Sequence, residues 1–172
     1  EMLQILVEAG VPPLARNTKG QSALHVANDL EKLNIVLSAP MFKGVDVNEP
    51  DVDSLTPLHH SVGLGEMAVR ELLCAGADPT VLTANCLSPL HVAASNGQGD
   101  VVGLLLAQYR ERNVLETYIN LLSDGSAPLH YACRAGSPEA VWTLLYNGAD
   151  ATLADKMGMT PLHVLSKVKP QT

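Results

Sequence analysis

Histidine and cysteine are the side chains of this sequence that could bind a metal or take part in a reaction. The chain has six histidines and three cysteines. His130 with Cys133, or Cys86 with His91, could supply two ligands of a zinc site. Five of the six histidines, however, end the same short phrase, whereas a structural zinc needs four ligands that converge on one point. The spacing therefore favours a structural role for these histidines, and we expect neither a metal nor a cofactor.

An enzyme site would have to be assembled from His60, which lies outside that phrase, together with Asp53 and Cys86. Residues Gly97–Gly103 contain part of a dinucleotide-binding fingerprint, but that motif requires a preceding strand and a βαβ unit, and helical patterns flank it here. The sequence has no nucleophile elbow, phosphate loop or metalloprotease motif. We therefore expect that the chain is not an enzyme.

The repeated phrase has the residues that begin a helix: in its commonest form a hydroxyl residue, then proline, leucine and histidine. It occupies residues 22–25, 56–59, 88–91, 127–130 and 160–163. The hydroxyl can cap free N–H groups, and proline is well tolerated at the first helical position. The histidine can reach back to the cap, or across to the loop of the neighbouring unit. A second phrase, Gly-Ala-Asp, is present at 76–78 and 148–150 and follows the pattern of a second helix, such as Pro138–Leu145.

These phrases, repeated about every 33 residues, resemble the ankyrin repeat family over essentially the whole chain. The resemblance implies an all-α fold, a solenoid of stacked helix-turn-helix units with turn or hairpin tips, because so short a helix pair cannot bury its apolar face alone. We expect a single domain over 1–172, and we expect both of its ends to fall within a repeat of a longer array or a larger protein. Its repeats are 17–50, 51–82, 83–121 with an insertion, and 122–154, and its partial repeats are 1–16 and 155–172.

The first two full repeats depart from the pattern around their second helices. Proline is unfavourable inside a helix, so Pro40 predicts that the second helix of the first repeat stops near Ser38 and that Ala39–Lys43 is irregular. The partial repeat before it should contribute a helix over Glu1–Ala9. In the second repeat one residue is missing after Gly65, which shortens the turn between its helices.

The third and fourth repeats carry further departures. Six extra residues with strong helical propensity pass through Tyr109–Glu116, so we expect a second helix longer by one or two turns, followed by an irregular loop at Thr117–Leu122. In the fourth repeat Ala127 replaces the capping hydroxyl, at a cost of about 1 kcal/mol unless Ser126 substitutes for it.

The resemblance implies that a protein or peptide partner binds in a concave groove, formed by the tips and by the exposed ends of the first helices. One alternative is an intramolecular scaffold or regulatory segment of a larger multidomain enzyme or channel, and another is a spacer between domains. In some members of the family an Asp-Val-Asn turn is hydroxylated on asparagine, which makes Asn48 a candidate. The predicted partner-binding residues are Lys19, Gln21, Asp53, Leu55, Leu64, Asn85, Leu87, Asn96, Asp124, Arg134, Met157 and Met159.

Composition narrows the classes of partner and the compartment. The net charge of −7 disfavours nucleic acid, because lysine and arginine supply the affinity for phosphate backbones. No apolar stretch approaches the roughly 20 residues that cross a bilayer. Residues Glu1-Met2-Leu3 begin no basic segment followed by an apolar one, so we expect no signal peptide. Three cysteines without a Cys-x-x-Cys pair favour a reducing compartment. We expect an intracellular, cytoplasmic protein that takes no small-molecule substrate.

Overall fold

The computed structural model describes residues 15–39 and 45–167. These residues fall into two compact units, unit 1 within Glu1–Val81 and unit 2 within Leu82–Thr172. The helix expected over Glu1–Ala9 lies outside the described residues, as does most of the irregular segment expected over Ala39–Lys43. Each unit is described by itself below.

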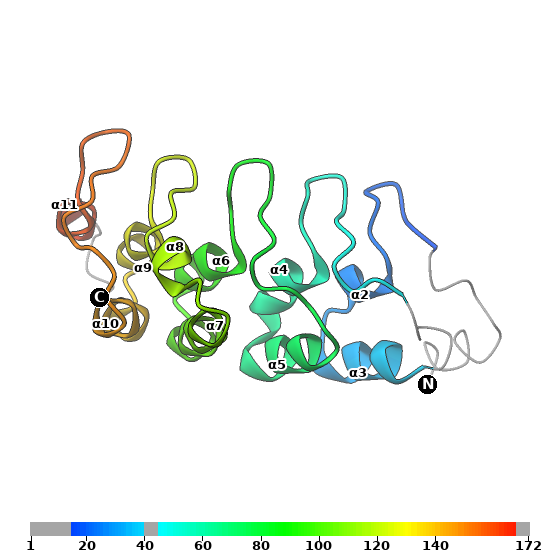
Figure 1. Cartoon of the computed structure of the whole chain (residues 1–172). Helices are drawn as coiled ribbons and strands as arrows, with labels where there is room; N and C mark the ends of the chain where they lie inside the picture. The colour runs from blue at the N-terminus through cyan, green and yellow to red at the C-terminus, as the bar shows by residue number, and fades with distance from the viewer. Residues whose placement is uncertain (1–14, 40–44, 168–172) are drawn as a thin grey trace. The chain divides into compact units, whose positions relative to one another are not determined.

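Unit 1 is made of two successive helix pairs. The first helices, α2 and α4, pack beside each other, and the second helices, α3 and α5, form a separate row beneath them (Figure 1). A hairpin loop, called a tip below, precedes each first helix, and the two tips of unit 1 span residues 17–21 and 51–55. The helices are α2 (Ala23–Val26), α3 (Leu30–Ser38), α4 (Pro57–Ser61), the 3-10 helix η2 (Val62–Leu64) and α5 (Glu66–Cys74).

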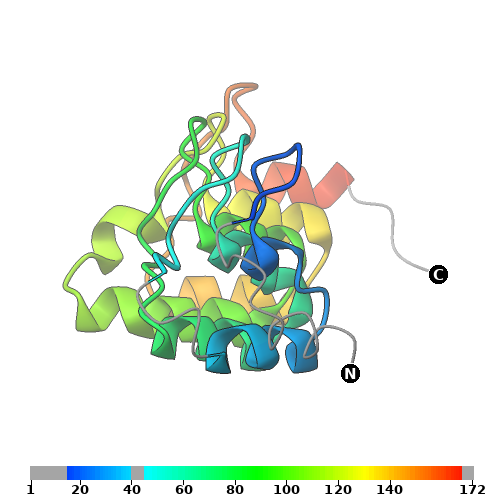
Figure 2. The same cartoon turned by 90° about the vertical axis from the view of Figure 1, so that its right-hand side faces the viewer.

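Unit 2 repeats this arrangement. The first helices α6, α9 and α11 lie in one row, the second helices α7 and α10 lie in another, and the tips 83–87, 123–126 and 155–159 rise beyond the first helices (Figure 2). Within the described part of the chain there is no strand, only an isolated bridge between Ser123 and Ser126. The helices are α6 (Pro89–Ser95), α7 (Gly99–Glu111), α8 (Leu115–Ile119), α9 (Pro128–Ala135), α10 (Pro138–Tyr146) and α11 (Pro161–Lys167).

Leucine and valine from both helix rows fill the core of each unit. In unit 1, Leu58 of the first row and Leu72 of the second are fully buried. In unit 2, Leu90 and Leu105 hold the corresponding places and are also fully buried. Each such leucine stabilises the fold by roughly 1.5–3 kcal/mol. A single pair would leave these side chains facing water, so the packing of pair on pair holds each unit together.

The helix boundaries of the first two repeats confirm their predictions. α3 ends at Ser38, two residues before Pro40. In the second repeat α4 runs on as η2, and Gly65, with φ +95°, is the single residue between η2 and α5. Glycine adopts this left-handed backbone without a Cβ penalty, which is why one residue suffices for the turn.

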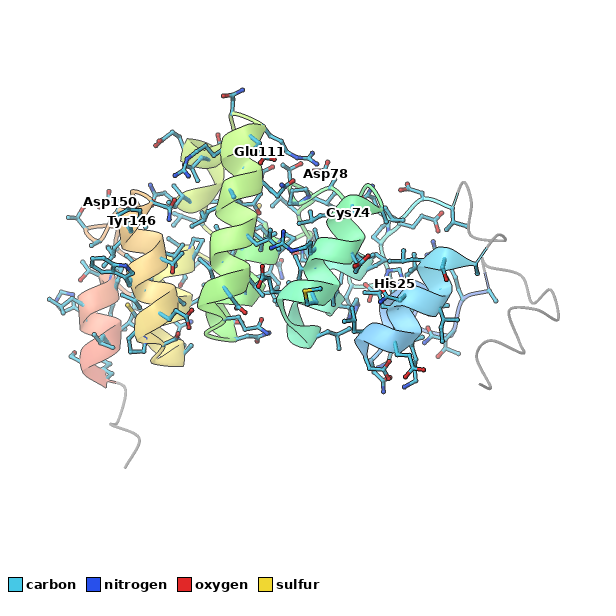
Figure 3. All side chains as sticks on the ribbon, turned by 90° about the horizontal axis from the view of Figure 1, so that it is seen from below. His25, Cys74, Asp78, Glu111, Tyr146 and Asp150 are labelled. Atoms are coloured by element: carbon cyan, nitrogen blue, oxygen red, sulfur yellow. The ribbon has the colours of Figure 1, made fainter. Side chains whose placement is uncertain are left out.

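The third repeat confirms one prediction and corrects another. α7 spans 13 residues, against nine in α10, so the second helix is longer as expected; Figure 3 marks Glu111 at its end. The irregular loop expected over Thr117–Leu122 is wrong in its first half, because α8 extends to Ile119. Asn113, with φ +59°, reverses the chain after α7. The ring of Tyr118 then stacks on Tyr109, with centroids 4.8 Å apart, and this contact stabilises a second short helix.

None of the described helices is long and apolar enough to cross a membrane.

Candidate functional site

The five phrase histidines do the same structural work. In each, Nδ1 accepts the backbone N–H of the residue that caps its helix, at 3.1–3.3 Å. His91 and His130 also reach the loops that lead into the next repeat: Nε2 of His91 donates to the carbonyl of Leu121 at 2.9 Å, and Nε2 of His130 to that of Met159 at 3.1 Å. Both predicted roles of the histidine, back to the cap and across to the neighbouring loop, are confirmed.

The fourth repeat lacks the hydroxyl that the others place beside this histidine. The side-chain oxygens of Ser22, Thr56 and Ser88 lie 2.8–2.9 Å from the Nδ1 of their histidines. No side-chain oxygen caps α9, so Ser126 does not substitute for the missing group at Ala127. The α9 cap therefore keeps only the hydrogen bond from the Ala127 N–H to Nδ1 of His130.

The first residue of most tips holds the loop in shape through its side chain. In unit 1, Oδ1 of Asp51 accepts the N–H groups of Asp53 at 3.0 Å and Leu55 at 2.9 Å. Asn17 and Asp155 hold their own tips by the same pair of bonds. In unit 2, Thr83 accepts the N–H of Leu87 at 3.1 Å. The loops are thus fixed from inside, and the side chains at their apices are mostly exposed, although Asp124 pairs with Lys156 of the next tip.

Neighbouring tips are also fastened to each other within each unit. The N–H of Val52 donates to the carbonyl of Lys19 at 3.1 Å in unit 1. In unit 2 the hydroxyl of Ser123 donates to the carbonyl of Asn85 at 3.0 Å. Successive tips therefore present their apices at a fixed spacing within a unit.

The fourth residue of each five-residue tip adopts a left-handed backbone. Gly20 and Gly158 occupy this position in two tips, but Ser54, with φ +62°, and Cys86, with φ +58°, occupy it in the other two. Cys86 therefore stands at a turn position that glycine holds in the tips 17–21 and 155–159. The tip 123–126 is one residue shorter, with positive φ at both central residues, Asp124 and Gly125, as a type I′ hairpin turn requires.

The predicted partner-binding residues divide by exposure. In unit 1, Lys19 and Asp53 are exposed at the apices, whereas Gln21, Leu55 and Leu64 are half-buried. In unit 2, Leu87 and Met159 are half-buried, and Arg134 stacks over the ring of Tyr131 at 5.5 Å. The exposed members of unit 2 are Asn85, Asn96, Asp124, Arg134 and Met157.

His60 pairs with a carboxylate, but not with the one that sequence reasoning selected. Its Nε2 lies 2.9 Å from Oδ2 of Asp51, whose side chain is 1% exposed. Asp53 is exposed, and Cys86 belongs to the other unit. Burial raises the pKa of Asp51, but hydrogen bonds from His60 and from the amides of Leu55 and Asp53 outweigh it and hold that pKa below its usual value. The His60–Asp51 pair therefore helps to hold the tip 51–55 in its conformation.

The remaining candidates for chemistry show no assembled site. Among the residues that the structure describes, no three His, Cys, Asp or Glu side chains are placed to hold a metal ion. Cys74 and Cys86 are exposed free thiols, and Cys133 is a buried one. Burial raises the pKa of the Cys133 thiol, which disfavours the reactive thiolate.

Two asparagines that join successive repeats were not recognised from the sequence. Oδ1 of Asn48 accepts the N–H of Asp78 at 2.7 Å, and its Nδ2 donates to the carbonyl of Gly76 at 3.3 Å. In unit 2, Oδ1 of Asn120 accepts the N–H of Asp150 at 2.8 Å. Both asparagines lie three residues before a tip and 30 residues before the aspartate of the next Gly-Ala-Asp phrase. That shared spacing was the available signal.

Comparison with known proteins bears on the identity of these repeats. A family model described as ankyrin repeats (3 copies) matches residues 29–117 and 91–168. B-cell lymphoma 3 protein homolog of Mus musculus is 34% identical over 169 residues, which cover 95% of this chain and 36% of that protein. NF-kappa-B inhibitor delta of Mus musculus is 31% identical over 192 residues, covering 95% and 58%.

A human relative matches a shorter stretch. SMC5-SMC6 complex localization factor protein 1 is 40% identical over 120 residues, which cover 67% of this chain and 11% of that protein. The chain thus spans between about a tenth and three fifths of the length of these three relatives. Ankyrin repeats are protein–protein interaction modules. The family model matches most of the residues that carry the repeated helix pairs, and the chain therefore belongs to the ankyrin repeat family.

Proposed function

We propose that this chain is a non-catalytic module that binds a protein or peptide partner through its tips and the adjoining ends of its first helices. One observation carries the proposal: four of the five described tips are held by hydrogen bonds to the side chains of their own first residues, so the shape of these tips does not depend on their exposed apex side chains. Loops fixed on a rigid scaffold lose little conformational entropy when they bind, which favours recognition.

The proposed binding surface consists of the twelve residues predicted from the sequence, taken separately for each unit. Its most accessible residues include Lys19 and Asp53 in unit 1, and Asn85 and Met157 in unit 2, all of which are exposed. The half-buried leucines, such as Leu55 and Leu87, line its base. We further propose that the repeats follow the boundaries given by the repeated phrase, and that the protein acts inside the cell, where its three thiols stay reduced.

The names of two relatives support a protein as the partner. One is an inhibitor of NF-kappa-B, and another is a localization factor of the SMC5-SMC6 complex. The acidic balance of the chain, with a net charge of −7, supports the exclusion of nucleic acid. A segment of the same polypeptide could occupy the surface in place of a separate protein, and this intramolecular form is the alternative.

A comparison of two double variants tests the proposal. Asn85→Lys with Met157→Lys alters two exposed apices of unit 2, and Ala107→Lys with Thr117→Lys adds the same charge at exposed positions of α7 and α8. All three proteins are immobilised, and proteins captured from extracts of cells that express the chain are quantified by mass spectrometry.

The proposal predicts that the apex variant loses partners that the wild type and the α7/α8 variant retain. Equal capture by all three proteins would contradict the assignment of the tips. If the wild type captures nothing specific, a purely spacing role is favoured instead.

A further inference from the structure

Two imidazole rings and a buried carboxylate meet in unit 1, where two repeats adjoin. His25 belongs to α2, His60 to α4, and Asp51 is the first residue of the tip 51–55. The rings of His25 and His60 lie edge to face, with centroids 5.6 Å apart. Oδ2 of Asp51 accepts from Nε2 of His60 at 2.9 Å and from Gln21 at 3.4 Å. Three titratable groups therefore share one contact between α2, α4 and a tip.

The hydrogen bonds of His25 determine where its proton lies. Nδ1 accepts the backbone N–H of Ser22 at 3.1 Å, so the neutral ring carries its proton on Nε2. The residue is only 4% exposed, and Nε2 is buried without a hydrogen-bond partner in the described part of the chain. Burial, and next the neighbouring His60, lower the pKa of His25, whereas Asp51 and the nearby carbonyls of Leu55 and Glu49 oppose this.

Unit 2 contains the same contact with one titratable ring fewer. His91 holds the place of His25, and Tyr131 holds that of His60, with ring centroids 5.4 Å apart and also edge to face. The Nε2 of His91 donates to the carbonyl of Leu121, and the hydroxyl of Tyr131 donates to the carbonyl of Ser123 at 3.4 Å. The fold thus accepts a neutral phenol where unit 1 has a second imidazole.

We propose that the His25–His60–Asp51 cluster is a pH-sensitive device, which loosens the contact between α2 and the tip 51–55 when His25 takes up a proton. A proton on His25 places a charged imidazolium in this buried contact, edge to face with the ring of His60. The buried carboxylate of Asp51 is already bonded to Nε2 of His60 and to Gln21. Protonated Nδ1 also can no longer accept the N–H of Ser22, so this half of the α2 capping box is lost as well.

Other charged groups around α2 do not offset a charge on His25. On α3, Lys32 pairs with Asp29, and Glu31 is exposed. On α4, Nδ1 of His59 accepts the backbone N–H of Thr56, which caps that helix. In the tip, Asp53 is exposed, so Asp51 is the one buried carboxylate among the described residues of this contact.

The sign of the pH dependence follows from the lowered pKa of His25. The unfolded chain binds this proton at about the usual value of 6.5, and the folded chain binds it only at lower pH. The contribution of His25 is therefore fully present above about pH 6.5 and is lost as the pH falls through the folded value. Asp51, whose pKa is also lowered, stays ionised throughout that window and loses its contribution only at more acidic pH.

Partner binding in unit 1 should then depend on pH. Gln21, Asp53 and Leu55 all bond to Asp51, and all three belong to the proposed binding surface. This consequence rests on the proposed function. The titration itself does not, since it can be measured without any partner.

The experiment uses the whole chain and follows histidine rings and backbone amides by NMR between pH 8 and pH 5. We expect the His25 ring to titrate below the usual value. We also expect hydrogen exchange at the Asp53 and Leu55 amides, corrected for the intrinsic rate, to become several-fold faster with the same midpoint. A His25 ring that titrates at or above its usual value, or amide protection that is unchanged across this range, would overturn the proposal.

Variants separate the device from general acid sensitivity. His25→Gln cannot titrate but can still accept the cap N–H, as glutamine does in a capping box, so the amide response should disappear. His60→Tyr copies the contact of unit 2 and should reduce the response. His163→Gln, at the exposed cap of α11, should leave it as in the wild type. A full response in His25→Gln would contradict the proposal, and if that variant fails to fold, a full response in His60→Tyr would do so.

Discussion

Ser54 and Cys86 carry a backbone conformation that costs an ordinary residue about 1–2 kcal/mol. Both stand at the fourth position of a tip, with φ near +60°, where Gly20 and Gly158 stand in other tips. The loop shape is fixed by the side chain of the first tip residue and by the backbone bond that closes the hairpin. The strain is therefore imposed locally, and it can be removed by a single substitution.

Cys86→Gly is expected to stabilise the protein by about 0.5–1 kcal/mol, because relief of the left-handed strain outweighs the greater entropy of an unfolded glycine. The change is read from the urea midpoint of unfolding. Ala84→Gly, in the same tip but without positive φ, should instead be neutral or destabilising. A loss of stability in Cys86→Gly comparable to that of the control would show that the thiol has a role that the structure does not reveal.

Ala127→Ser should restore the missing cap of α9 and stabilise the protein by about 0.5–1 kcal/mol. The serine hydroxyl would lie beside Nδ1 of His130, as that of Ser88 lies beside His91 at 2.8 Å. Ser88 is itself fully buried, so the equivalent position of the third repeat accommodates this oxygen inside the fold. Thermal unfolding measures the gain, and Ala127→Gly serves as a comparison that adds no acceptor. If both variants lower the melting temperature equally, the cap is not what limits α9.

Between elements, side-chain hydrogen bonds join one repeat to the next. Asn48 and Asn120 accept the N–H groups of Asp78 and Asp150, which follow the second helix of the next repeat. His91 and His130 donate to the carbonyls of Leu121 and Met159, in the loops that lead into the next repeat. These bonds are regular in spacing: three of them span 30 residues and the fourth spans 29. The asparagine and histidine bonds therefore set the register of repeat on repeat within each unit.

Asn120→Ala should destabilise the protein by about 1–3 kcal/mol, because it leaves the N–H of Asp150 without its acceptor. Asn85→Ala, at an exposed apex, should change stability by less than about 0.5 kcal/mol. Denaturant unfolding of both variants gives the comparison. An equal, small effect would mean that water replaces the Asn120 amide at no cost.

Much of the element order was predictable, and the exceptions have physical causes. The capping phrase is local, so Thr56 and Pro57 predict the start of α4 without any information from the rest of the chain. α8 was missed because its helix depends on the packing of Ile119 and on the stacking of Tyr118 on Tyr109, neither of which a local pattern reveals. The His60–Asp51 pair was missed for a related reason: both Asp51 and Asp53 are near in sequence, and only the folded tip decides which carboxylate turns inward.

Over the whole molecule, each unit separates residues that maintain the fold from residues free to bind. The first tip residue, the capping histidine and the joining asparagine serve the fold, whereas the apices and helix ends are left to solvent. Such a division is expected of an interaction module, because binding residues can vary while the scaffold persists. It also explains why a sequence that identifies its family so readily gives no name to its partner.

The most direct test of the proposed binding surface is a hydrogen–deuterium exchange footprint of the chain, alone and bound to a partner captured by the wild type but not by the apex variant. We predict protection of peptides that contain the tips, such as residues 83–87 and 155–159 of unit 2, with no change in α7 and α10. Protection confined to α7 and α10, with the tips exchanging as in the free chain, would contradict the account.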